Sequence, residues 1–387
     1  MINDLIIYTP MYVTLFWASV LLLSKHSNNN AKQFLGVFMI VTFILYLSHA
    51  VFFKKHNDIF VYFDPIYNFA SLAVYPLYYW YIKLLTSETH INYKNLQLLI
   101  PAFVSGVALL IIYLLMSPQE RVSYVDGFLF KKSIDNVESV LIQIQKGIYL
   151  LSRLTFIIQI IVFLLLGNRL VKKYNWRISN FYSNLENRTI IWVKMLFISF
   201  IVTSVMGIGF NIIGRTVFFD STFLLIIPSV IFSALLFIIG FQGHLQNYTV
   251  VDLNKDEKVH PELDIKNYNK KLLKDKLLNL FEDDTIYRDS NLKMTQVSEL
   301  LQTNRTYISN LINNEFSCSF SEFVNNYRIN EAKKILIDDS FRNYSLNYIS
   351  EEVGFGSLNT FIRVFKELEK MPPGKYRQLF FQTNKNC

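Results

Sequence analysis

The residues with the clearest hydrogen-bonding chemistry lie near the C-terminal end of the chain, on one face of a predicted helix. Asn359, Thr360, Arg363 and Lys366 follow Ser357 at spacings that place them opposite the apolar residues of the same helix. Asparagine and arginine side chains present paired hydrogen-bonding groups that match the major-groove edges of adenine and guanine. The pattern therefore indicates recognition through hydrogen bonds and charge.

Residue types that bind metals or form disulfides are few and scattered. The two cysteines, Cys318 and Cys387, are too few for a disulfide scaffold or a four-cysteine zinc site. Among the six histidines, no two have the His-x-x-x-His spacing of a helical metal site. We therefore predict no metal, no cofactor and no catalytic residues.

Two short helices joined by a turn are predicted in the segment 294–318. Thr295, followed by Ser298 and Glu299, predicts a capped helix that continues through Leu301. Asn304 predicts the N-terminus of a second helix. The apolar face of that helix consists of Tyr307, Ile308, Leu311 and Ile312. Two such helices, the second with exposed polar residues, form a helix-turn-helix.

The same pattern returns downstream. Ser345 predicts another capped helix through Val353, and Gly354 can take the left-handed conformation that ends it. Ser357 predicts a further helix whose inward residues are Phe361, Val364 and Phe365. Between the two units, residues 320–336 are predicted to form one helix about 26 Å long. Such a helix could hold two recognition helices about one DNA turn, roughly 34 Å, apart.

The segment 267–380 resembles the DNA-binding domain of the AraC/XylS transcription regulators. The resemblance rests on the helix at 305–314, on SFSEFVNNYRINEAKKIL at 319–336 and on ISEEVGFGSLNTFIRVFKELEKMPPGKYR at 349–377. It implies an all-helical domain with two helix-turn-helix units that binds double-stranded promoter DNA. RNA polymerase and a second copy of the chain are the further partners that it implies. The preceding two thirds is similar to the N-terminal multi-span domain of membrane-anchored relatives.

The resemblance also assigns DNA contacts to individual residues. It places base contacts at three positions in each recognition helix, and neighbouring positive residues, Lys375 among them, would hold phosphates. The predicted DNA-binding residues are Arg305, Thr306, Ser309, Asn310, Leu358, Asn359, Arg363 and Lys366.

This chain departs from the family pattern at several positions. Asn310 stands where many members have arginine, Leu358 is apolar where a polar residue is usual, and Ser317 replaces a common glycine. Arg328 and Glu331 are predicted to form an ion pair at the rim of the core rather than to contact DNA.

The charge distribution divides the chain into two parts. The net charge is +8 overall; residues 1–243 have 18 Lys+Arg against 10 Asp+Glu, and residues 244–387 have 20 against 20. Seven stretches of the first part are long and apolar enough to span a bilayer. They are Leu5–Leu23, Phe34–Phe53, Ile66–Leu85, Leu96–Met116, Ile148–Gly167, Ile190–Ile213 and Thr222–Phe241.

The sequence thus predicts an all-α protein with a seven-helix transmembrane domain at 1–242, a linker at 243–266 and the DNA-binding domain at 267–387. The loops 24–33, 86–95 and 168–189 carry eight Lys/Arg, against seven in the loops on the other side. This bias places the N-terminus outside a bacterial cytoplasmic membrane and the C-terminal domain in the cytoplasm. Three cations inside the predicted spans, Lys83, Arg153 and Lys194, are expected to reach the lipid headgroups.

We therefore expect a membrane-bound transcription regulator whose spans anchor it in lipid and sense an unidentified signal. An enzyme such as a sensor kinase is not expected, because the soluble part has no glycine-rich nucleotide loop. One alternative stays open, a multi-span receptor or transporter whose helical tail is a protein-interaction module without DNA binding.

Overall fold

The computed structural model describes residues 2–24, 30–54, 57–130, 139–186, 188, a few positions between 198 and 209, 222–246, 248–258 and 270–383. Within these residues every regular element is a helix, apart from an isolated antiparallel bridge between Tyr182 and Lys293. The chain divides into two compact units, one of residues 1–172 and 190–251, the other of residues 173–189 and 252–387. The second unit therefore includes a segment that the sequence places between two predicted spans.

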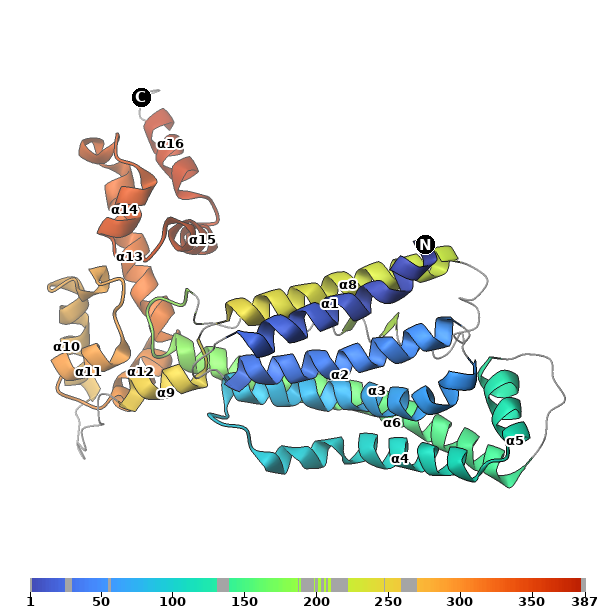
Figure 1. Cartoon of the computed structure of the whole chain (residues 1–387). Coiled ribbons are helices and arrows are strands. Elements are labelled where there is room, and N and C mark those ends of the chain that lie inside the picture. The colour runs from blue at the N-terminus through green and yellow to red at the C-terminus, as the bar shows by residue number, and fades with distance from the viewer. Residues whose placement is uncertain are drawn as a thin grey trace. The chain divides into compact units, whose positions relative to one another are not determined.

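The first unit is a set of long helices that run side by side in Figure 1. α1 packs against α2 and α8, α2 against α3, and α3 against α4. The bounds are α1 Ile2–Leu23, α2 Asn30–Phe53, α3 Asn57–Thr86, α4 Ile100–Leu115, α6 Val140–Ser179 and α8 Thr222–Leu245. A short 3-10 helix (Tyr93–Leu99) precedes α4, and α5 (Pro118–Val122) with a π-helical turn (Ser123–Leu129) follows it.

Five helices in the described residues are long and apolar enough to cross a membrane. They are Ile6–Leu23, Asn30–Phe53, Tyr93–Leu115, Val140–Ser179 and Ile226–Glu257. The predicted number of seven is therefore not confirmed. The predicted span Ile66–Leu85 does lie inside α3, which is not among these five helices; its tyrosines and Lys83 lower its hydropathy. The predicted span Ile190–Ile213 lies almost entirely outside the described residues.

α6 extends well beyond the stretch predicted for it. It has 40 residues, about 60 Å of helix at 1.5 Å per residue, whereas a bilayer's hydrocarbon core is about 30 Å thick. The first part of the predicted loop 168–189 is therefore helical through Ser179. The residues of α6 from Lys173 onward belong to the second unit.

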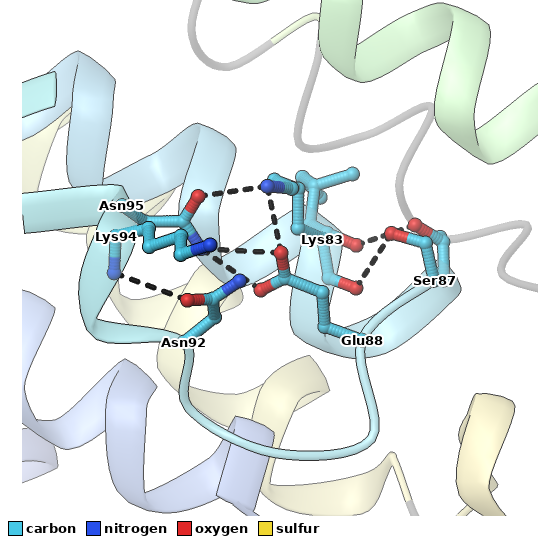
Figure 2. A network of polar contacts seen from close by, with 8 residues as sticks. Lys83, Ser87, Glu88, Asn92, Lys94 and Asn95 are labelled. Carbon is cyan, nitrogen blue, oxygen red and sulfur yellow. Dashed lines mark hydrogen bonds and ion pairs between the residues drawn. The ribbon is translucent and has the colours of Figure 1, made fainter.

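Two of the three cations in the predicted spans, Lys83 and Arg153, lie in the described residues and have partners within the protein. Lys83 Nζ lies 2.7 Å from a carboxylate oxygen of Glu88 and 2.8 Å from Oδ1 of Asn95, and Figure 2 draws both contacts as dashed lines. Arg153 lies over the ring of Tyr149, 4.1 Å from its centroid, and lines a small cavity with Ser152. Both side chains therefore have partners within the protein, and their reach to the lipid headgroups stays a prediction. Lys194 lies outside the described residues.

The second unit contains the predicted helix-turn-helix helices and two apolar cores. α11 (Met294–Leu300) and α12 (Arg305–Glu315) pack with α10 (Lys270–Glu282) on the first core, which includes Leu277, Phe281 and Ile312. α14 (Leu346–Glu352) and α15 (Leu358–Glu369) pack on the second core, which includes Ile349, Phe361 and Phe365. α9 (Val250–Lys258) and α16 (Pro373–Thr383) complete the unit, with short 3-10 turns at Ile286–Arg288 and Asp339–Phe341.

α13 (Phe320–Ile337) joins the two cores as the single continuous helix that the sequence predicts. Its N-terminal half contributes Phe320, Phe323 and Val324 to the first core, and its C-terminal half contributes Ile329 and Leu336 to the second. Ser319 caps its N-terminus in a capping box with Glu322. Because one helix belongs to both cores, the spacing of the two helix-turn-helix units is set by its length.

Two local predictions for the first helix-turn-helix unit are wrong. The predicted cap Thr295 lies inside α11, whose N-cap residue is Lys293, and its side chain is buried. Tyr307 lies on the outer side of α12 with 41% of its surface exposed, instead of on the apolar face. In both cases packing against the first core, rather than the local pattern, decides which side of the helix is buried.

Arg328 does not form the predicted ion pair with Glu331. It is 1% exposed, and its guanidinium donates to the backbone oxygens of Tyr287 and Asp289, each at 2.7 Å. Burial lowers the pKa of Arg328 to about 10, so it stays charged at neutral pH. Glu331 instead pairs with Arg288 and Lys334. An arginine in the middle of α13 thus holds the turn before α11 through backbone carbonyls.

Candidate nucleic-acid interface

α12 presents the predicted contact residues of the first helix-turn-helix unit. The side chain of Asn304 caps the helix by accepting from the backbone N–H of Thr306 at 2.7 Å. Buried Ile308, Leu311 and Ile312 fix the opposite face against the first core. Thr306 and Asn310 are exposed, whereas Ser309 is half-buried. The outer face of α12 is therefore polar, with Arg305 as its first residue.

α15 presents the corresponding face of the second unit. Ser357 caps it by accepting from the N–H of Thr360, and Phe361, Val364 and Phe365 are buried beneath. Asn359, Arg363 and Lys366 are exposed, at spacings that place them on one side of the helix. The Arg363 guanidinium lies 3.1 Å from the carboxylate of Glu367.

Leu358 has a different environment from the other predicted contact residues of α15. It is half-buried and packs against the second core. The face that a ligand could reach from solvent therefore consists of Asn359, Arg363 and Lys366 in the second unit.

Ser317, in the turn that follows α12, has a φ of 53°. This is the left-handed region, where a residue without a Cβ is least strained. A glycine, which the resemblance places at this position, would adopt this conformation without strain. The serine of this chain adopts it at a cost in backbone strain.

Comparison with known proteins identifies this region. A family model described as a helix-turn-helix domain matches residues 297–379. Three curated relatives from Bacillus subtilis each match about a quarter of the chain, and all three are described as uncharacterized HTH-type transcriptional regulators. YtdP is 34% identical over 90 residues, which are 23% of this chain and 11% of YtdP. YfiF is 37% identical over 101 residues, 24% of this chain and 31% of YfiF.

One solved structure also matches, the C-terminal domain of the two-component response regulator yesN from Fusobacterium nucleatum. It is 27% identical and covers 28% of this chain and 96% of the solved chain, with a TM-score of 0.24. Residues 297–379 form an AraC-type helix-turn-helix domain. The matches cover about a quarter of this chain and well under half of each curated relative, so they describe this domain alone.

The AraC-type domain is bound by a segment that the sequence analysis did not connect with it. We call residues 177–186 the strap. Its backbone pairs with the residues before α11, because the N–H of Ser183 donates to Leu292 O at 3.1 Å and the N–H of Met294 donates to Phe181 O at 2.9 Å. Phe181, Tyr182 and Ser183 are buried. The strap is therefore an integral part of this unit.

Polar side chains of α13 also hold the strap. The hydroxyl of Ser321 donates to the backbone oxygen of Ser183 at 2.9 Å, and Arg328 donates to the Ser183 hydroxyl at 3.3 Å. Asp256 of α9 accepts from the Tyr182 hydroxyl and from Lys293. Burial opposes ionisation of Asp256, but the hydrogen bonds from Tyr182 and Lys293 outweigh it and lower its pKa.

Two glutamates from outside the matched region lie at the beginning of the recognition helices. Glu186 of the strap accepts from the hydroxyls of Ser357 and Thr360, at 2.7 and 3.1 Å. Glu257 of α9 lies 3.6 Å from the guanidinium of Arg305. The sequence analysis missed both residues. The one local sign in the strap was an aromatic pair, Phe181 and Tyr182, in a segment predicted to be a loop.

Proposed function

We propose that this chain is a membrane-anchored transcription regulator that binds specific DNA sequences through α12 and α15. The proposal is carried by one observation: two polar recognition helices are held on separate cores that α13 joins. Two helices held in this way can each enter the major groove on the same side of a duplex. Within this frame, Asn359 and Arg363 are the proposed base contacts of α15, with Lys366 and Lys375 as phosphate contacts. Thr306, Ser309 and Asn310 are the proposed contacts of α12.

The long helices of the first unit support the membrane anchor. Besides their length and composition, they expose large apolar side chains to the surroundings. In α4, Phe103, Leu114 and Leu115 are each at least 60% exposed, and in α6 so are Leu151 and Ile158, at 63% and 60%. A protein in water rarely exposes so much contiguous apolar surface, whereas lipid covers it at no cost. We propose a multi-pass location in the bacterial cytoplasmic membrane, with the N-terminus outside.

The proposed partners follow from this arrangement. Lipid surrounds the long helices, and the AraC-type domain, in the cytoplasm, meets promoter DNA and RNA polymerase. A second copy of the chain on the same promoter would offset the low charge of the soluble part, where 20 Lys+Arg are matched by 20 Asp+Glu. The first unit would receive the signal.

The test is a footprint of the full chain, reconstituted in lipid nanodiscs, on duplexes selected from a randomised pool. Arg363→Ala is expected to weaken binding by about 1–3 kcal/mol, roughly 5- to 150-fold, because a bidentate base contact is lost. Lys276→Ala, which removes the same charge from exposed α10, is the matched control and should change affinity much less.

The outcomes separate the two candidate functions. A protected site that Arg363→Ala weakens and Lys276→Ala does not supports the proposal. No protection at low salt, for the wild type and for the variants Glu186→Gln and Glu257→Gln that remove the carboxylates beside α15 and α12, would contradict it. The helical tail would then be better explained as a protein-interaction module.

A further inference from the structure

Both recognition helices begin next to an acidic side chain that lies outside the AraC-type domain. Glu186 comes from the strap and Glu257 from α9. We propose that these two carboxylates stand in for DNA phosphates and keep the domain in a closed state until the strap is displaced. The inference rests on the proposed DNA-binding function and adds to it a contact within the same chain that competes with DNA.

The contact at α15 is the stronger of the two. The N-terminus of a helix has unsatisfied N–H groups and a partial positive charge, which favour a bound anion. Phosphates of DNA commonly bind at such positions, and the first turn of a recognition helix is the part that meets the groove. Here the carboxylate of Glu186 accepts two hydroxyl hydrogen bonds, from Ser357 and Thr360, at this position. A phosphate and this carboxylate cannot occupy it together, because both are anions.

The contact at α12 acts through an arginine. Arg305 is the first residue of α12 and one of the predicted DNA-binding residues, and Glu257 lies 3.6 Å from its guanidinium. Glu257 also accepts from Nε of Arg177 at 2.9 Å, so one carboxylate holds two arginines. Arg305 is therefore neutralised by the protein in the state described, and its charge would become available to DNA once Glu257 moves.

The end of the strap that contacts α15 lies at the surface, whereas the middle of the strap is buried. Phe181, Tyr182 and Ser183 are 1–3% exposed and form the backbone pairing with the residues before α11. Asn184 and Leu185 are half-buried, and Glu186 is exposed. Exchange of Glu186 for a phosphate thus breaks hydrogen bonds at the surface and leaves the buried residues in place.

Chain connectivity supplies a route for control. The strap begins within the last turn of α6, a candidate span that starts at Val140, and it precedes the predicted span 190–213. A signal that changes the position of either helix would pull on the strap.

The first experiment measures DNA affinity of the full chain in nanodiscs with Glu186→Gln, Glu257→Gln and the double variant. The probe is a duplex selected from a randomised pool with the double variant. Each single variant is expected to bind roughly tenfold more tightly than the wild type, and the double variant more tightly still. Because glutamine keeps the size of glutamate, the change isolates the charge.

Glu315→Gln is the matched control, because it also removes one negative charge from the unit. Glu315 pairs with Lys270 and Lys274 at the C-terminal end of α12, about 15 Å along the helix from Arg305. Equal affinities of the wild type and the double variant would overturn the inference while leaving DNA binding intact. Failure of every variant to select a duplex would instead contradict the proposed function.

A second experiment locks the strap. A Cβ at Gly356 would lie 3.5 Å from Cγ of Asn184, so side chains at these two positions touch and two cysteines there are near enough to be joined. The double variant Asn184→Cys/Gly356→Cys, with Cys318 and Cys387 replaced by serine, should therefore close under an added oxidant. The closed form is expected to bind the selected duplex at least tenfold more weakly than the reduced form. Retained affinity in the closed form, or no closure of the folded protein, would overturn the inference.

Discussion

The two helix-turn-helix units end their first helix with the same hydrogen bonds but with different residues. After α11, Gln302 N–H donates to Glu299 O at 3.0 Å and Thr303 N–H to Ser298 O at 2.9 Å. After α14, Gly354 N–H donates to Glu351 O at 3.0 Å and Phe355 N–H to Ser350 O at 2.8 Å. This is the helix ending that a left-handed residue allows.

The left-handed residue is a glutamine in one unit and a glycine in the other, with φ of 48° and 89°. A Cβ at Gly354 would lie 2.5 Å from the backbone oxygen of Arg288 and 2.6 Å from that of Tyr287. Gln302 is exposed. The comparison teaches that the close approach of another backbone, more than the left-handed conformation itself, demands glycine.

The recognition helices differ in a second way. α15 carries Arg363 and Lys366, both exposed although Arg363 pairs with Glu367 of the same helix. α12 has polar but uncharged Thr306, Ser309 and Asn310, and its half-buried Arg305 is paired with Glu257. Charge favours tight attachment and uncharged hydrogen-bonding groups favour selection among bases. We expect α15 to supply more of the affinity.

The largest expected effect is that of Gly354→Ala. It should lower the free energy of unfolding by about 1–3 kcal/mol, because the added methyl group meets two carbonyl oxygens and the backbone is strained. Urea unfolding of the full chain in nanodiscs, followed by tyrosine fluorescence, measures it. If a substitution in the turn after α11 lowers the free energy of unfolding by as much as Gly354→Ala does, the proposed difference between the two turns is wrong.

The next effect is on DNA affinity. Asn310→Ala in α12 is expected to cost about 1 kcal/mol, less than Arg363→Ala in α15, because a neutral hydrogen bond is weaker than a charge-assisted one. Both variants are titrated against the same selected duplex at two salt concentrations. Arg363→Ala alone should reduce the salt dependence; an equal reduction by Asn310→Ala would contradict the division between the helices.

Gln302→Gly is expected to have a smaller effect, of opposite sign to Gly354→Ala. The change removes the backbone strain of a non-glycine residue in the left-handed conformation at an exposed position. It should therefore raise the free energy of unfolding by up to about 1 kcal/mol. The same urea experiment measures it. Destabilisation by this change would mean that the Gln302 side chain contributes contacts that outweigh the backbone strain.

The smallest effect concerns pH and the strap. The pKa of Asp256 is below its ordinary value of 3.8, so its ionisation stabilises the folded unit above that pH, and the contribution is lost as pH falls through the lowered pKa. The difference in urea midpoint between wild type and Asp256→Asn should therefore shrink below pH 3.8. A difference that stays constant on acidification would show that the carboxylate charge does not matter there.

Much of the second unit could be predicted from the sequence. The caps Asn304, Ser345 and Ser357, the left-handed Gly354 and the continuous helix through 320–336 are confirmed, and so are the buried Phe361, Val364 and Phe365. These features depend on residues a few positions apart, whose hydrogen bonds and periodicity are local. The same is true of the apolar stretches that became long helices in the first unit.

The contacts that only the tertiary structure decided join residues that are far apart in the chain. Arg328 is buried among carbonyls rather than paired with Glu331, because the turn around Tyr287 closes over it, 41 residues away. Glu186 and Ser357 are 171 residues apart, and no periodicity relates them. The sequence by itself determined two helix-turn-helix units and an apolar helical region, since each follows from local spacing. Tertiary packing decided what covers the recognition helices, because that depends on which distant segment fits the finished surface.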